Sequence, residues 1–84
     1  MPMYFVYILY SASRHKFYAG STADPLERLR KHNTDHHGFT GKTGDWEIKY
    51  QEEFVLKSVA LKRENQIKSW KSRLMIEKLI SEED

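Results

Sequence analysis

The chain has 84 residues, of which 39% are hydrophobic and 31% charged, and it contains no cysteine. This composition is typical of a single folded domain, here residues 1–84, and it excludes disulfides and metal sites that use thiolates. The net charge is +2, and because three acidic residues end the chain, the part before them is more basic than this value. A basic domain attracts polyanions, although many domains without such a partner are equally basic.

The first expected strand covers residues 3–10, which are rich in β-branched and aromatic side chains and apolar on both alternating faces. This pattern predicts a central strand that is covered on both sides. A short polar segment separates it from a second strand over residues 17–22, so the two strands form a local antiparallel hairpin. The apolar opening has no basic region before it and becomes polar at Ser11, so we expect no signal peptide, no membrane span and a cytoplasmic location.

A helix is expected after the hairpin. The pair Asp24-Pro25 supplies an N-cap and a first-turn proline, and the helix runs to about His32. Helical periodicity places Leu26 and Leu29 on the face directed at the core. Arg28 and His32 lie one turn apart on the flank of that face, where a packed helix borders solvent.

The rest of the chain predicts one more strand and two more helices. Residues 33–44 show no periodicity and predict a loop, and residues 46–54 alternate as a strand does. The pattern then becomes helical from Lys57 and again from about Ser72. The expected buried residues are Val59, Ala60, Ile67 and Trp70 in the first of these helices and Ile76, Leu79 and Ile80 in the second. The predicted fold class is α+β in the order β-β-α-β-α-α, with a three-stranded antiparallel sheet whose first strand is central and whose faces are flanked by helices.

A set of polar side chains and one glycine is distributed over these elements in a defined order. Its members are Tyr7 on the first strand, Tyr18 and Gly20 on the second strand, Arg28 and His32 on the first helix, and Glu64 on the second helix. Each motif alone is common, but their order and spacing together resemble the GIY-YIG nuclease domain. The likeness covers the whole chain and is closest to small stand-alone bacterial members and to structure-selective endonuclease subunits. One departure is Phe5, which stands where the family name has glycine.

This resemblance implies a metal-dependent endonuclease that hydrolyses DNA phosphodiester bonds, with a preference for DNA structure and a role in repair or recombination. It implies Tyr7 as the general base, Arg28 as the group that neutralises phosphoryl charge, and Glu64 as the ligand of Mg²⁺ or Mn²⁺. The residue types suit these roles, because a guanidinium matches phosphate oxygens and Mg²⁺ is commonly held by one or two carboxylates with water and phosphate. Tyr18 would orient the water or the phosphate, and His32 would tune Tyr7 or relay its proton.

Further residues are candidates for contact with nucleic acid. Gly20 has no side chain and lets a phosphate or a neighbouring group approach the second strand closely. Thr40, Lys42 and Thr43 lie in the predicted loop after the first helix, where they are suited to contact a DNA backbone. Lys68 on the second helix extends this set. So small a chain has little further surface for recognising DNA, which favours structure preference, low specificity or a protein partner.

Each candidate also has a structural explanation when it is taken alone. Strand tyrosines are often core aromatics, and Arg28 and His32 suit a solvated helix face. Glu64 precedes Lys68 by four residues, the order of an ordinary surface ion pair. Residues 35–37 combine an aspartate with two histidines, but adjacent histidines seldom converge on one metal ion. The alternative functions are a nucleic-acid-binding module without catalysis and a protein-interaction adaptor whose basic face docks an acidic partner.

Overall fold

The apolar first strand is the centre of the sheet. A computed structural model describes residues 3–34 and 44–82 of the chain. In it β1 (Tyr4–Ser11) pairs antiparallel with β2 (Lys16–Thr22) along one side and with β3 (Trp46–Phe54) along the other, which gives the strand order β2-β1-β3. The predicted three-stranded antiparallel sheet with a central first strand is confirmed, and β2 and β3 are its edges.

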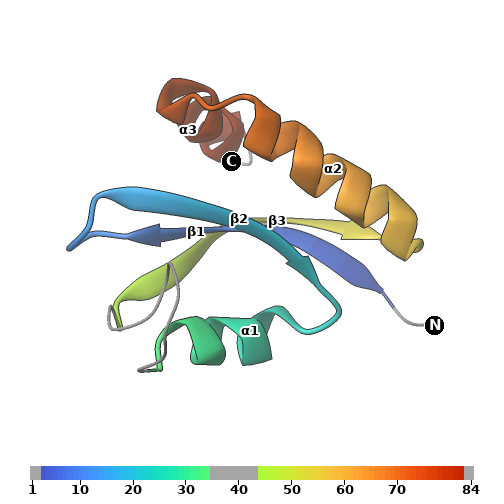
Figure 1. Ribbon diagram of the computed structural model, residues 1–84, viewed down its shortest axis with the longest axis horizontal. Coiled ribbons are helices and arrows are strands. Elements are labelled where there is room, and N and C mark those ends of the chain that lie inside the picture. The colour runs from blue at the N-terminus through green and yellow to red at the C-terminus, as the bar shows by residue number, and fades with distance from the viewer. Residues whose placement is uncertain (1–2, 35–43, 83–84) are drawn as a thin grey trace.

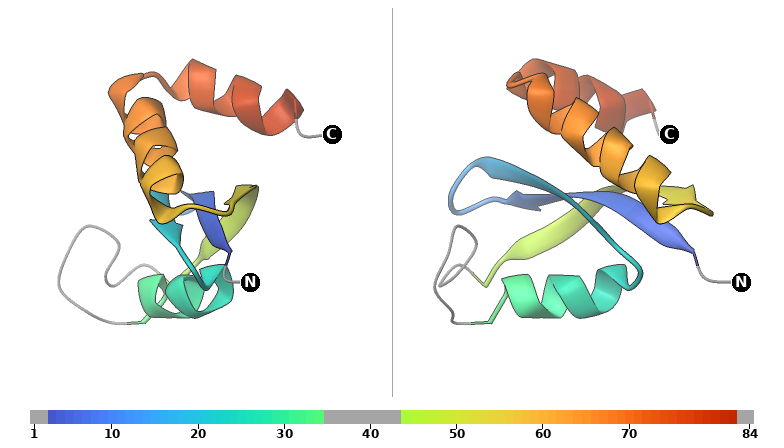
Figure 2. Two further views of the ribbon diagram at one scale, coloured as in Figure 1. Left: turned by 90° about the vertical axis from the view of Figure 1, so that its right-hand side faces the viewer. Right: turned by 45° about the vertical axis from the view of Figure 1, so that its right-hand side comes forward.

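Helices cover both faces of this sheet. One face lies against α1 (Pro25–His32), and the other lies against α2 (Lys57–Ser69) and α3 (Arg73–Glu82), as Figure 1 and the turned views of Figure 2 show. The order β-β-α-β-α-α and the α+β class agree with the sequence prediction. In the described part of the chain, no helix has the length and the apolar character that crossing a membrane requires.

The central strand sends alternate side chains into two apolar clusters, one on each face of the sheet. The cluster toward α2 comprises Val6, Ile8, Ala19, Tyr50, Ala60 and Ile67. The cluster toward α1 comprises Tyr7, Leu9 and Trp46. Because both faces of β1 are buried, both must be apolar, which explains the unbroken hydrophobic stretch at the start of the chain. The smaller cluster includes a phenol, so α1 packs over a face that carries a polar atom.

One leucine and one valine are more exposed than the helical patterns of their segments predict. Leu26 is 73% exposed, because the buried residue of α1 is His32 in its last turn and the first turn of the helix stands away from the core. Val59 is 42% exposed, because the buried residues of α2 are Ala60 and Ile67. The inner face of α2 is therefore centred on these two residues. Glu64 follows Ala60 by one helical turn and is half-buried beside that face.

Candidate active site

The phenol of Tyr7 lies inside the protein on the face that α1 covers. Its partner across the β1-β2 ladder is Gly20, and a Cβ atom added to Gly20 would lie 2.5 Å from the Oη and 2.7 Å from the Cζ of Tyr7. Any side chain at this position would collide with the ring. The neighbouring group that glycine admits is thus the phenol itself, while a contact between Gly20 and nucleic acid stays a prediction.

The helix α1 brings two cationic or basic side chains to this phenol. It begins as predicted, with the Asp24 carboxylate accepting a hydrogen bond from the Glu27 amide at 3.2 Å. It ends at His32, which is 7% exposed and whose Nε2 lies 3.1 Å from the Oη of Tyr7. Arg28, one turn earlier, hydrogen-bonds the same phenol although the residue is exposed. The burial of His32 excludes the solvated-face interpretation for this residue.

Tyr18 lies beside the imidazole at the edge of the sheet. The centroid of its ring is 4.7 Å from that of His32 and 6.5 Å from that of Tyr7. The Nζ of Lys68, which belongs to α2, lies 5.9 Å from the centroid of the Tyr18 ring. The edge of β2 is therefore the place where side chains from α1 and α2 approach one another.

Glu64 reaches the same edge from the other side of β2. Its side chain is 14% exposed, and its Oε1 accepts a hydrogen bond of 2.6 Å from the hydroxyl of Ser21. Its Oε2 accepts a hydrogen bond of 2.5 Å from the ammonium of Lys68. The ion pair expected from the spacing of Glu64 and Lys68 is present. In addition, Ser21 of the sheet donates a hydrogen bond to the other oxygen of this carboxylate. An ordinary surface ion pair has no such bond to the sheet.

The electrostatics of these groups are linked. Burial raises the pKa of Tyr7 above its ordinary value of 10.0, and the hydrogen bond from Arg28 offsets part of that increase. The hydrogen bond to Tyr7 raises the pKa of Arg28, and the charge of Glu64 raises it further. One phenol thus interacts with a guanidinium from α1 and a carboxylate from α2. Tyr7 is a neutral phenol near neutral pH, because burial disfavours its charged form.

The structure brings together the side chains that the sequence analysis singled out as catalytic. They are Tyr7, Tyr18, Arg28, His32 and Glu64, with Lys68 next to them. Thr40, Lys42 and Thr43 lie outside the described residues, and so do residues 35–37.

Ser21 was missed by the sequence analysis. It follows the tyrosine-x-glycine pattern directly, and strand alternation points its side chain away from the face of Gly20 and toward α2. That alternation was a usable signal, but it does not say which residue of α2 the hydroxyl meets.

The donor atoms fit a single divalent cation held by one carboxylate. Among the residues that the structure describes, no three histidine, aspartate or glutamate side chains gather as a metal cluster. A carboxylate is nevertheless a hard oxygen ligand, and Mg²⁺ commonly takes only one or two of them together with waters and phosphate. Oε2 of Glu64 already faces a cation, the ammonium of Lys68, so this oxygen borders a position where positive charge is stabilised.

Phenols, an imidazole, a guanidinium and a carboxylate at one sheet edge are the groups that a phosphodiester hydrolase needs for proton transfer and charge neutralisation. The model of the GIY-YIG catalytic domain matches residues 3–78. The chain therefore belongs to the GIY-YIG catalytic domain family, and the GIY-YIG domain is a nuclease domain. Neither the search of curated proteins nor the search of solved structures gave a significant match.

Proposed function

We propose that the protein is a divalent-metal-dependent endonuclease that hydrolyses DNA phosphodiester bonds, with Tyr7, Tyr18, Arg28, His32 and Glu64 as its catalytic residues. The observation that carries the proposal is that Arg28 and His32 of α1 hydrogen-bond one buried phenol at the edge of β2, where Ser21 also holds the carboxylate of Glu64 from α2. Family membership supports nuclease chemistry. The metal, the DNA substrate and a role in repair or recombination are our proposal.

Tyr7 and His32 form the proposed proton path. In the tautomer that carries its proton on Nδ1, His32 accepts the hydrogen bond of the Tyr7 hydroxyl at Nε2, 3.1 Å away. The phenol oxygen takes a proton from the attacking water while its own proton passes to His32. Burial raises the pKa of Tyr7 and so disfavours a free phenolate. In the concerted transfer no free phenolate forms, because the phenol loses its proton as it gains one. Tyr18 packs against the imidazole and limits its orientation.

Arg28 is proposed to bind the scissile phosphate. A guanidinium has five N–H donors, so Arg28 keeps donors for phosphate oxygens after it has bonded Tyr7. Its planar shape matches two of those oxygens, and it stays charged at any relevant pH. A phosphate bound there lies next to the phenol, so the water that Tyr7 deprotonates is close to the phosphorus atom. The leaving oxygen takes its proton from solvent water.

Glu64 is the residue that would hold the metal ion. When bound, the ion would polarise the phosphate and stabilise charge on the leaving oxygen. Ser21 fixes Oε1, whereas Oε2 is paired with Lys68, whose side chain is 47% exposed and can move into solvent. Oε2 is thus the oxygen that can exchange its partner. A single protein ligand predicts weak metal binding in the absence of DNA.

Substitution of the arginine and the carboxylate tests the proposal. Arg28→Ala and Glu64→Gln should each lower kcat for cleavage of labelled DNA by at least about 100-fold, because each removes a group that acts on the transition state. The melting temperatures should stay near that of the wild-type protein. Arg30→Ala on the same helix and Glu53→Gln on β3 are matched controls, since both residues are exposed and outside the site. Cleavage at the wild-type rate by both site variants would show that the proposal is wrong.

The choice of DNA then separates the proposed function from its alternatives. Labelled duplex, single-stranded, flap and four-way DNA are each incubated with Mg²⁺ or with a chelator. Faster cleavage of flap or four-way DNA supports a role in repair or recombination, and loss of cleavage in chelator supports metal dependence. Salt-sensitive binding without cleavage at any metal concentration supports a non-catalytic module. No binding at low salt supports a protein-interaction adaptor.

A further inference from the structure

A row of lysines continues from the candidate active site along the edge of β2. Strand alternation places Gly20, Tyr18 and Lys16 on the same face of β2, with Gly20 at the site and Lys16 at the start of the strand. Beside Tyr18 lies the ammonium of Lys68. At the start of β2, Lys16 and Lys71 line one hollow of about 260 Å³. We call Lys16, Lys68 and Lys71 the basic row.

At the end of the basic row that lies away from the candidate site, two residues have positive φ angles. His15 and Lys71 have φ angles of +54° and +48°, a conformation that side chains with a Cβ atom rarely adopt. His15 lies in the turn between β1 and β2, Lys71 lies between α2 and α3, and both line the same hollow. Arg73 joins the two segments, because its Nη1 donates a hydrogen bond of 2.6 Å to the carbonyl of His15. This contact keeps Lys16 next to Lys71.

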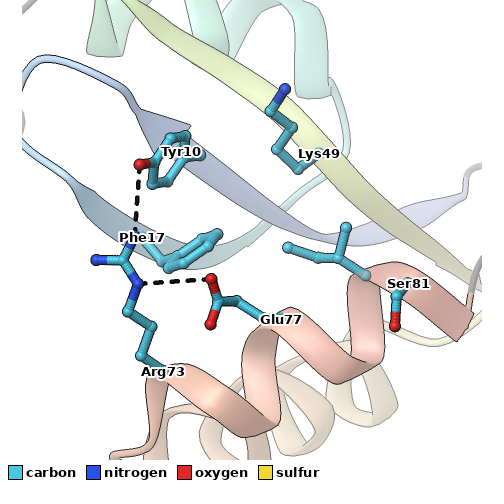
Figure 3. A pocket seen from close by; sticks show the side chains of 7 residues that line it. Tyr10, Phe17, Lys49, Arg73, Glu77 and Ser81 are labelled. Carbon is cyan, nitrogen blue, oxygen red and sulfur yellow. Dashed lines mark hydrogen bonds and ion pairs between the residues drawn. The ribbon is translucent and has the colours of Figure 1, made fainter.

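Arg73 does not belong to the basic row, because its guanidinium lies over two aromatic rings and is hydrogen-bonded to the hairpin. Its Cζ lies 5.3 Å from the ring centroid of Phe17 and 5.7 Å from that of Tyr10. Figure 3 shows the guanidinium directed at the Tyr10 hydroxyl and at the carboxylate of Glu77 on its own helix. Arg73 therefore fastens α3 to the hairpin.

We propose that the basic row binds the phosphate backbone of the cleaved strand and leads it from the β1-β2 turn to Arg28. From Lys16 to Gly20 the strand spans ~13 Å, a length over which one strand of B-DNA presents about four phosphates. A nucleic-acid backbone is favoured over an acidic peptide because the row is continuous with a site suited to phosphate. The position of the scissile phosphate rests on the proposed function, whereas binding by the row does not.

Two double variants of equal charge test this surface. K16Q/K71Q removes two lysines of the basic row. K62Q/K78Q removes two lysines elsewhere: Lys62 lines a hollow with Phe54 on the β3 side of α2, and Lys78 lies on α3. All four lysines are exposed, so both variants should melt at the wild-type temperature.

Binding of a short fluorescein-labelled DNA duplex is measured by anisotropy in chelator, where no cleavage is expected, at several salt concentrations. K16Q/K71Q should bind ~10-fold more weakly, and the slope of log affinity against log salt should become shallower by about 1.8, or 0.9 for each lost phosphate contact. K62Q/K78Q should bind within about twofold of the wild-type protein, because its lysines make no such contact.

The outcomes separate this proposal from the proposed function. Equal weakening by both double variants would show that the basic row is not the DNA-binding surface. Cleavage of DNA by the wild-type protein would still support the nuclease in that case. Weakening by K16Q/K71Q alone, without cleavage by the wild-type protein in Mg²⁺, supports the row and rejects the nuclease. Binding of polyglutamate but of no DNA at low salt makes the surface a protein docking site and overturns the proposal.

Neutral methylphosphonates placed singly in the cleaved strand locate the contact. Within about four nucleotides of the cleavage point, on one side of it, they should weaken binding by the wild-type protein. At the phosphates farthest from the cleavage point, the same substitutions should cause no further loss in K16Q/K71Q, because Lys16 and Lys71, the partners of those phosphates, are already absent. An equal loss in both proteins at every position would place the cleaved strand elsewhere.

Discussion

The two faces of the sheet bury different kinds of side chain. Toward α2 the cluster is built on aliphatic residues such as Val6, Ile8 and Ile67. Toward α1 the largest buried side chains are Tyr7 and Trp46, and the buried residue of the helix itself is a histidine. One face thus contributes mainly hydrophobic stabilisation, while the other holds polar atoms away from water, where hydrogen bonds and charges interact more strongly. The phenol and imidazole of the candidate site and the aliphatic cluster thus lie on opposite faces, while Glu64 reaches the edge of β2 from the α2 face.

Two glutamates, Glu52 and Glu64, each form an ion pair with a cation of α2, but they differ in how firmly they are held. Glu52 on β3 accepts three hydrogen bonds from Arg63, at 2.9–3.1 Å, and a further one from Tyr50. Burial works against the ionised form of Glu52, but the bonds from Arg63 and Tyr50 outweigh it and lower the pKa of this carboxyl. Glu64, in contrast, shares its Oε2 with a single ammonium. The first pair joins α2 to the sheet, and the second leaves a carboxylate oxygen that can change its partner.

Loss of one hydroxyl on the α1 face should have the largest effect on activity. Tyr7→Phe keeps the buried ring and removes the atom that contacts His32 and Arg28. We expect kcat for DNA cleavage to fall by about 10²–10⁴-fold, the usual contribution of general acid-base catalysis, and the free energy of unfolding to fall by only about 1–3 kcal/mol, through the lost hydrogen bonds. Tyr4→Phe in the same strand is the control, since Tyr4 packs against the other cluster. An active Tyr7→Phe variant would remove the phenol from the mechanism.

Truncation of an aliphatic residue on the α2 face should lower stability and leave kcat nearly unchanged. Ile67 is 1% exposed, so Ile67→Ala should lower the free energy of unfolding by about 2–5 kcal/mol, while Ile67→Val should lower it by about 0.5–1.5 kcal/mol. Urea denaturation measures both values. The kcat of the folded fraction, measured well below the melting temperature, should stay near that of the wild-type protein. A large loss of kcat in the folded protein would mean that the two faces are not independent.

Titration of Tyr50 should have the smallest effect and appear only in alkali. Burial, and then the hydrogen bond to Glu52, raise the pKa of Tyr50 from 10.0 to about 12. The folded state holds this proton more tightly than the unfolded state, so the stabilisation is complete below about pH 10 and is lost as the pH rises toward 12. Tyr50→Phe should cost roughly 1 kcal/mol at neutral pH, through one lost hydrogen bond, and should lose less stability in alkali than the wild-type protein.

Urea denaturation over a series of pH values checks this sign. Some alkaline loss should persist in Tyr50→Phe, because burial also raises the pKa of Tyr7. If the wild-type protein and Tyr50→Phe lose stability in parallel between about pH 10 and 12, the raised pKa of Tyr50 is wrong.

The architecture could be predicted from the sequence because each element carries a local signal. Residues 3–10 are apolar on both faces, and a strand of that kind must be central. The helix start at Asp24-Pro25 rests on a hydrogen bond within one turn. The faces of the helices were harder to predict, and Leu26 and Val59 are exposed against expectation. Which side of a helix is buried depends on its angle to the sheet, and local periodicity does not contain that angle.

The candidate site divides in the same way. By itself the sequence determined the residue types, their order and the alternation that puts Tyr18 and Gly20 on one face of a strand, because these depend on backbone geometry over a few residues. Only the tertiary structure decided that a glutamate on α2 meets Ser21, 43 residues earlier in the chain, and that the ring of Tyr7 fills the space above Gly20. Such contacts follow from the register of two strands and the packing of a helix against them, so they exist only once the whole chain is folded.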